Sequence, residues 1–184
     1  MTTDLADRKA SLRALLKGQI PPDPEGASRA VQERLLRSGP LPRNGVIALY
    51  RALPSEVGTN LLAAALLVNG ATLCWPRVTR GQILEFRRAG TDWTRGALRV
   101  EEPNGEPVPL PLIDWMVLPA QAMDLEGHRL GRGKGYYDAT LAAFPGRTVA
   151  LLFDLRIVPE VPSGENDRRV DALCTESRLV MVEG

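Results

Sequence analysis

The hydrophobic positions at the start of the chain recur at the spacing of an amphipathic helix. Four leucines mark one apolar stripe: Leu5, Leu12, Leu15 and Leu16. The pattern predicts a helix from Asp4 to Lys17, on which Lys9 and Arg13 share a face because they are four residues apart. A second helical pattern runs from Glu25 to Arg37, between two proline-containing breaks. We therefore expect two helices before the first strand.

The pattern then changes to short continuous apolar runs, which are typical of buried strands. Gly45–Tyr50 and Ala71–Trp75 are two such runs. Between them we predict a helix from Asn60 to Asn69, capped by Thr59 and well buried because it is apolar almost all round. Strand, helix and strand of these lengths predict a βαβ unit with parallel strands and a right-handed crossover.

The second half of the chain repeats this alternation. Strands are predicted over 82–88, 113–118, 147–153 and 178–182, and a helix over 136–144. Thr91 to Pro111 is rich in Gly and Pro, so we predict an irregular excursion with at most short strands. Trp93 in this excursion either covers a flat ligand or, more commonly for such a residue, fills a satellite core. Residues 1–184 are therefore predicted as one α/β domain with a mostly parallel sheet.

Composition narrows the class of protein. The chain has 184 residues, 44% of them hydrophobic, which is enough for a single buried core. A net charge of +1 provides no overall basic field, so we expect no nucleic-acid partner. No run reaches the ~18 apolar residues of a membrane span, and the start of the chain lacks an apolar signal core. We predict a cytoplasmic protein without a membrane partner, and expect a monomer.

The cysteines and the histidine limit the possible chemistry. Cys74 and Cys174 lie in separate apolar runs, so we interpret them as buried free thiols. The single histidine, His128, excludes a site with several histidine ligands. Catalysis by a His-activated Ser or Cys would require His128 itself, and an exposed loop residue is its simpler interpretation.

The segment Arg129–Asp138, with the sequence Arg-Leu-Gly-Arg-Gly-Lys-Gly-Tyr-Tyr-Asp, contains the strongest functional signal. Alternating glycines allow positive φ angles and a concave row of N–H groups, and the two cations between them add full charge. A helix starting near Tyr136 would point its N-terminus at the same place. The pattern predicts a polyphosphate site, with Asp138 placed to hold a phosphate-bound Mg²⁺. The spacing matches neither a P-loop nor a dinucleotide fingerprint, and a solvated flexible loop is the alternative.

Other candidates follow the predicted strands. Glu56 comes just after the carboxyl end of the first strand, where open α/β sheets bind ligands, and Arg51 shares that loop. This location favours the interpretation that Glu56 contacts substrate over the interpretation that it is a solvated surface acid. Asp167 lies in a loop after a strand and could join Asp138 around one Mg²⁺, or belong to a surface run balanced by neighbouring arginines.

Taken together, these residues resemble the 5-formyltetrahydrofolate cyclo-ligase family, also called methenyltetrahydrofolate synthetase. The resemblance spans nearly the whole chain and is most specific at Gly127–Asp138. Four further matches occur in the expected order: the Lys9/Arg13 pair, Glu56-x-x-Thr59, Pro76-Arg77, and Glu165–Asp167 before Val170-Asp171. One motif could occur by chance, but an ordered set of this kind is unlikely to.

The resemblance implies a three-layer α/β/α fold of the sugar-phosphate isomerase and CoA-transferase type. It also implies conversion of 5-formyltetrahydrofolate to 5,10-methenyltetrahydrofolate with MgATP, releasing ADP and phosphate. The implied ATP contacts are Lys9, Arg13, Arg129, Gly131, Arg132, Gly133, Lys134, Gly135, Tyr136 and Tyr137. Arg132, Lys134 and Tyr136 are the implied catalytic residues, Asp138 and Asp167 the Mg²⁺ ligands, and Glu56 and Arg51 the folate contacts.

The implied chemistry suits these residues. Phosphorylation makes the formyl oxygen a good leaving group, the neighbouring folate amine attacks, and the ring closes. Such a reaction needs positioning and charge neutralisation rather than a nucleophilic side chain. Two alternatives are a non-catalytic nucleotide-binding module on the same fold, and a sugar-phosphate isomerase or CoA transferase that would not use ATP.

Overall fold

A mostly parallel sheet of eight strands forms the centre of the protein. The computed structural model describes residues 2–96 and 100–183. The strand order is β12-β11-β10-β7-β1-β2-β3-β6, and the five strands from β11 to β2 are parallel. The strands are β1 (Val46–Ala48), β2 (Thr72–Arg77), β3 (Glu85–Arg87), β6 (Pro107–Val108), β7 (Trp115–Pro119), β10 (Arg147–Leu151), β11 (Ala172–Cys174) and β12 (Leu179–Met181).

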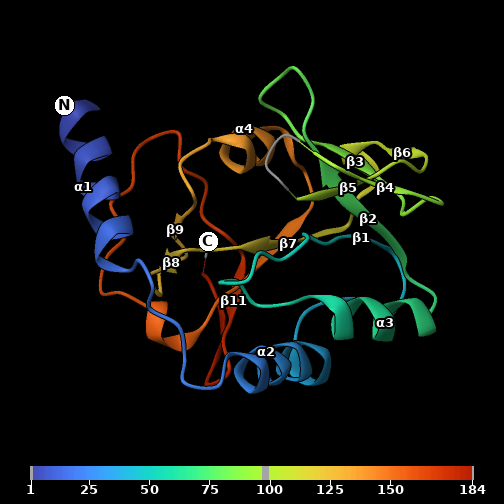
Figure 1. Ribbon diagram of the computed structural model, residues 1–184, viewed down its shortest axis with the longest axis horizontal. Helices are drawn as coiled ribbons and strands as arrows, with labels where there is room; N and C mark the ends of the chain where they lie inside the picture. The colour runs from blue at the N-terminus through green and yellow to red at the C-terminus, as the bar shows by residue number, and fades with distance from the viewer. Residues whose placement is uncertain (1, 97–99, 184) are drawn as a thin grey trace.

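Helices cover both faces of this sheet, which confirms the predicted α/β/α fold. Helices α2 (Pro24–Ser38) and α3 (Asn60–Val68) lie under one face, and α4 (Tyr136–Ala143) lies over the other (Figure 1). Helix α1 (Thr2–Leu15) stands at one side, next to the small β8–β9 hairpin (Figure 1). The carboxyl ends of the parallel strands therefore meet α1 and the start of α4 at one edge.

Two apolar cores, one on each face, hold the layers together. The larger packs Val31 and Leu35 of α2 and Leu62 and Leu66 of α3 against the sheet. The other places Leu141 of α4 over the opposite side of the same strands. Central strands with both faces covered must be apolar at every position, which explains why continuous runs predicted them correctly.

Most predicted elements are confirmed, and the βαβ unit is present with β1 parallel to β2. Two details of α3 were wrong. Leu67 and Val68 are 55% and 87% exposed, because only one side of α3 faces the core. Thr59 makes no side-chain cap, because its hydroxyl donates to the Tyr50 carbonyl at 2.9 Å and so ties α3 to the end of β1.

The segment from 91 to 111 has only short strands, as predicted, although residues 97–99 lie outside the described residues. Strands β4 (Trp93–Arg95) and β5 (Glu101–Pro103) form a hairpin that packs beside β2. Three short strands were not predicted: β11, and the β8 (Ala122–Met123) and β9 (Arg129–Leu130) pair that leads into the Gly-rich segment. Strands of two or three residues have too little pattern to be recognised.

None of the helices in the described residues is long and apolar enough to cross a membrane. Cys74 and Cys174 are buried free thiols, as predicted. Burial raises the pKa of each thiol to about 12. Both thiols therefore remain protonated near neutral pH and are poor nucleophiles.

Candidate active site

A cavity of about 370 Å³ opens at the carboxyl edge of the sheet. One wall comes from the ends of β1, β2 and β7, and the other from the Gly-rich segment and the start of α4. The lining residues are Leu53, Glu56, Pro76, Val78, Leu84, Glu102, Pro119, Ala120, Gln121, Arg129 and Gly131 to Asp138. The fold thus brings Glu56 and the Gly-rich segment, far apart in sequence, to one pocket.

The backbone of the Gly-rich segment turns as the alternating glycines predict, at two of the three positions. Gly133 and Gly135 have φ angles of +86° and +76°, which favour glycine. Gly135 is also the N-cap residue of α4, so the free N–H groups of that helix face the cavity edge. Gly131 has an ordinary φ but lies close to a cation, since a Cβ there would be 2.8 Å from Arg129 Nη1. These features suit an anionic ligand.

Arg129 is the buried cation of the site. It is 7% exposed, and its guanidinium donates to the Pro119 carbonyl at 3.3 Å and to Asp138 Oδ1 at 2.9 Å. The same guanidinium lies 5.5 Å from the centre of the Tyr137 ring. Arg129 therefore joins the end of β7 to the first turn of α4 and adds positive charge below the loop.

Arg132 reaches across the pocket to the acid that follows β1. Its Nε donates to Glu56 Oε1 at 2.9 Å, and its Nη2 donates to Ser55 Oγ at 3.1 Å. The Glu56 side chain is only 6% exposed, and its second oxygen accepts the Leu53 N–H at 2.9 Å. The pair links the two walls of the cavity, and Lys134 adds an exposed cation on the same loop.

The two tyrosines line the cavity with different surroundings. Burial is the main cause that raises the pKa of Tyr137, and Glu56 raises it further while Arg129 opposes the shift. Its phenol therefore stays neutral at physiological pH and can donate a hydrogen bond. Tyr136 begins α4, and its carbonyl accepts the Thr140 hydroxyl at 2.6 Å.

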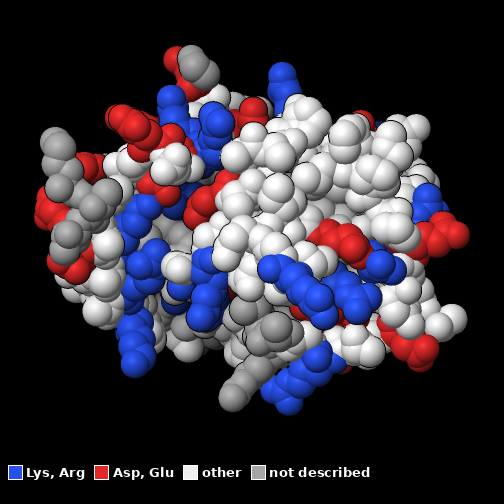
Figure 2. All heavy atoms as spheres, turned by 90° about the horizontal axis from the view of Figure 1, so that it is seen from above, with Lys and Arg blue, Asp and Glu red and all other residues white. Residues whose placement is uncertain are grey.

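Helix α1 places its two basic residues beside the site by different contacts, and neither of them lines the cavity. Arg13 Nε donates to the Gly131 carbonyl at 2.8 Å, so Arg13 supports the loop from behind. Lys9 Nζ lies 2.6 Å from both carboxylate oxygens of Asp167. Seen from above, basic side chains gather on the surface between α1 and α4 (Figure 2). The predicted shared face of Lys9 and Arg13 is thus directed at the Gly-rich segment and the loop beside it.

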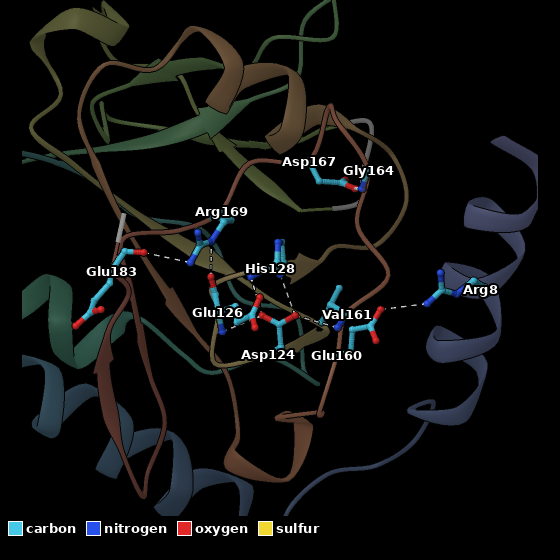
Figure 3. A network of polar contacts seen from close by, with 10 residues as sticks. All are labelled: Arg8, Asp124, Glu126, His128, Glu160, Val161, Gly164, Asp167, Arg169 and Glu183. Carbon is cyan, nitrogen blue, oxygen red and sulfur yellow. Dashed lines mark hydrogen bonds and ion pairs between the residues drawn. The ribbon is translucent and has the colours of Figure 1, made fainter. Parts of the chain in front are cut away.

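A buried carboxylate holds the stem of the Gly-rich segment. Asp124 accepts the backbone N–H groups of Glu126 and His128 on Oδ1, and that of Val161 on Oδ2 at 3.0 Å. His128 Nδ1 lies 3.0 Å from the same Oδ2 (Figure 3). His128 is therefore a half-buried part of the turn rather than an exposed loop residue, because Asp124 binds both its backbone and its ring.

Some predicted site residues lie away from the cavity. Asp167 binds Lys9 and the Gly164 N–H, and it does not line the pocket that Asp138 lines. Arg51 pairs with Glu101 and lies 4.9 Å from the Trp93 ring centre, also outside the cavity lining. Trp93 packs edge-on against Trp75 with ring centres 5.3 Å apart, so it packs against the larger core rather than a satellite core and does not line the cavity.

Sequence reasoning missed two charged residues near the cavity. Glu102 lies within the irregular excursion, and Arg156 sits on a short 3-10 turn, Asp154–Arg156, where it donates to the Gln121 carbonyl at 3.2 Å. Glu102 follows Glu101 and precedes Pro103, a pattern without a distinct chemical signal. Only the packing of the β4–β5 hairpin against β2 reveals that Glu102, unlike Glu101, points into the cavity.

Fold and cavity define an α/β protein with a Gly-rich cationic loop at the carboxyl edge of its sheet, facing an apolar wall that carries two acids. A model of the 5-formyltetrahydrofolate cyclo-ligase family matches residues 4–176. The chain belongs to the 5-formyltetrahydrofolate cyclo-ligase family. The resemblance inferred from the motifs is therefore confirmed, and with it the class of enzyme.

Individual relatives agree with this assignment. The cyclo-ligase of Mycolicibacterium smegmatis is 30% identical over 148 residues, which cover 73% of this chain and 75% of that protein. The Escherichia coli K12 cyclo-ligase is 23% identical over 178 residues, covering 91% and 98%. The mouse cyclo-ligase is 40% identical over only 70 residues, so the matched part spans about a third of that protein (34%) and 35% of this chain.

Solved structures show the same fold. The 5,10-methenyltetrahydrofolate synthetase of Aquifex aeolicus superposes with a TM-score of 0.82 and 26% identity, over 98% of this chain and 93% of that one. The Mycoplasma pneumoniae synthetase has a TM-score of 0.73 over 94% and 99% of the two chains. At 17% identity, the second match supports the fold alone.

Proposed function

We propose that this enzyme converts 5-formyltetrahydrofolate to 5,10-methenyltetrahydrofolate with MgATP, giving ADP and phosphate. The observation that carries the proposal is the shared cavity: a Gly-rich cationic loop and a helix N-terminus face an apolar wall with the acid Glu56. One pocket can thus hold a polyphosphate and a heterocycle side by side. Family membership supports the same reaction.

The reaction proceeds in two steps. The γ-phosphoryl group passes from ATP to the formyl oxygen, so the bond to ADP breaks and a formyl O–P bond forms. The N10 amine of the folate then attacks the formyl carbon. The C–O bond breaks, phosphate leaves with that oxygen, and the amine proton is released. No side chain becomes covalently modified, so the enzyme acts by positioning and charge stabilisation.

The residues of the loop would share the work on the phosphate. Arg132 and Lys134 would neutralise charge on the transferred group, and Tyr136 would contact it from the start of α4. Arg129, the N–H groups of Gly131 to Gly135, and Tyr137 would hold the other phosphates, together with Lys9 and Arg13 from α1. Glu56 would bind N–H donors of the folate, and Arg51 would act at the outer rim.

Asp138 would be the protein ligand of Mg²⁺, and phosphate oxygens and water would complete the coordination, since the described residues contain no group of three potential metal-ligating side chains. This carboxylate lines the cavity in the first turn of α4, and among the described residues only Arg129 contacts it, through one oxygen. Asp167 would contribute only after leaving Lys9. When bound, Mg²⁺ neutralises phosphate charge and orients the nucleotide. Asp138→Asn should therefore raise the Mg²⁺ concentration needed for half-maximal turnover.

The first test is the near-ultraviolet absorbance of the methenyl product on mixing enzyme, 5-formyltetrahydrofolate, ATP and Mg²⁺. A rise that disappears when either ATP or Mg²⁺ is omitted supports the proposal. Nucleotide binding without product, measured by calorimetry, would instead identify a non-catalytic nucleotide-binding protein. Product formed without ATP would contradict the phosphoryl-transfer step.

Arg132→Ala tests the central role of the loop. Since Arg132 is 47% exposed in its side chain, the fold should persist while kcat falls about a hundredfold or more. Arg43→Ala, which removes an exposed arginine that precedes β1, is the matched control and should leave kcat unchanged. Near-normal turnover of Arg132→Ala would remove this residue from the mechanism.

A further inference from the structure

Glu102 is a buried acid in the wall of the cavity. It lies in β5, where the side chains alternate, so that Glu101 is exposed while Glu102 is 7% exposed. Gly96, the residue just after β4, leaves room for this inward position, since a Cβ on Gly96 would lie 2.0 Å from the Glu102 carboxyl carbon. The hairpin is therefore built to direct a carboxylate into the cavity.

The carboxylate has spare acceptor capacity. An ionised Glu offers about four lone-pair positions. Among the described residues, Oε1 accepts the Val78 N–H at 3.2 Å, and Oε2 has only Arg77 Nε at 4.0 Å, which is too far for a hydrogen bond. A buried charge with so few donors is costly unless another molecule supplies them. A ligand in the cavity is placed to do so.

The surroundings of Glu102 select a flat apolar ligand with N–H groups. Pro76, Val78 and Leu84 line the cavity beside it, and Arg77, which does not line the cavity, is the cation paired with it at 4.0 Å. The cations of the loop enter from the opposite wall, after β9, so a phosphate is better held there. Within the described residues, no group of three potential metal-ligating side chains includes Glu102.

We propose that Glu102 is a specificity-determining residue that accepts hydrogen bonds from the N–H donors of the folate pterin ring. The inference rests on the proposed function, because it takes the heterocycle to be a pterin. A pterin carries a ring N–H and a neighbouring amino group on one edge, which match two carboxylate oxygens. Glu56 and Glu102 would then contact different parts of one substrate, from the β1 and β5 sides of the pocket.

The test measures binding rather than turnover. Affinities for 5-formyltetrahydrofolate and for ATP are determined by calorimetry for wild type, Glu102→Ala, Glu102→Gln and the control Glu106→Gln, an exposed acid just beyond the hairpin. We expect Glu102→Ala to weaken folate binding about tenfold or more, with ATP affinity unchanged. Glu102→Gln, which keeps one acceptor oxygen, should recover part of the loss, and Glu106→Gln should match wild type.

A second readout separates recognition from support of the fold. Pterin and lumazine, in which an oxo group replaces the 2-amino group, are compared as competitors of folate binding. Wild type should prefer pterin, and Glu102→Ala should lose that preference. If Glu102→Ala fails to fold, the comparison is made with Glu102→Gln, which should show a reduced preference.

Three results would overturn the inference: unchanged folate affinity in Glu102→Ala, an equal loss of ATP affinity, or an intact preference for pterin in the variants. Failure of wild type to bind folate would contradict the proposed function as well as this inference. If wild type binds folate normally and the Glu102 variants bind it equally well, the inference about Glu102 is contradicted and the proposed function is not.

Discussion

Arg156 is a buried arginine without a carboxylate partner among the described residues. It is 3% exposed, and its guanidinium donates to the carbonyls of Gln121 and Gln19, while its Nε makes no hydrogen bond. Burial lowers its pKa, Arg132 lowers it further, and Glu56 opposes the shift. A guanidinium nevertheless remains charged, so Arg156 places an uncompensated positive charge near the loop.

We predict that Arg156→Gln weakens polyphosphate binding. Removing a nearby charge should cost about 1 kcal/mol of attraction, or about fivefold in affinity, at an effective dielectric constant near ~20. The increase in melting temperature produced by tripolyphosphate should therefore be smaller in Arg156→Gln. Arg156→Lys, which keeps the charge but changes the hydrogen bonds, should retain most of that increase. Equal shifts in wild type and Arg156→Gln would exclude a role for the charge.

At the scale of the element, helix α1 is attached to the domain mainly by polar contacts. Its apolar contribution is small: Leu12 joins a small cluster with Leu16, the residue just after the helix, Leu5 lies against Gly164, and Leu15 is 69% exposed. The side chains of the Lys9–Asp167 pair are only 18% and 17% exposed. Those of Arg8 and Glu160, which pair as drawn in Figure 3, are 51% and 74% exposed. The two pairs should differ in their effect on stability.

Lys9→Gln should loosen α1. Loss of a largely buried ion pair should lower the unfolding free energy by about 1–2 kcal/mol and increase hydrogen exchange of the α1 amides. Because Arg13 on the same helix supports the Gly131 carbonyl, ATP affinity should also fall. The control Arg8→Gln removes the exposed pair and should change neither quantity measurably. Similar exchange rates in the two variants would show that the Lys9 pair does not hold the helix.

At the scale of the whole molecule, the Arg132–Glu56 pair connects the Gly-rich loop to the opposite wall of the cavity, which we propose as the nucleotide and folate sides. A nucleotide that takes over Arg132 would leave the buried Glu56 without its cation. N–H groups of the folate could then donate hydrogen bonds to the Glu56 carboxylate, because Arg132 no longer occupies it. Binding of the two ligands should therefore be mutually favourable, and by linkage each should raise the affinity of the other by the same factor.

We predict that a non-hydrolysable ATP analogue increases folate affinity about fivefold or more. Calorimetric titrations with each ligand, in the absence and the presence of the other, measure both sides of this linkage. Glu56→Gln removes the charge that Arg132 neutralises, so the two affinities should become nearly independent. Undiminished coupling in Glu56→Gln would assign the effect to another contact.

The sequence by itself determined most of the elements and the turns of the Gly-rich segment. Continuous apolar runs specify the central strands because both faces of the sheet are covered, and alternating glycines specify the turns of Gly133 and Gly135 because few other residues adopt those φ angles. The order of the motifs along the chain was sufficient to recognise the family.

Only the tertiary structure decided which side chains meet. It placed Glu56 against Arg132, turned Glu102 inward and buried Arg156 against the Gln121 carbonyl. It also held Asp167 on Lys9 and Arg51 on Glu101, outside the cavity. These contacts join segments far apart in the chain, and their geometry depends on how the hairpin, α1 and the sheet pack together. Local patterns of apolar and polar residues carry no information about such distances, because they describe one segment at a time.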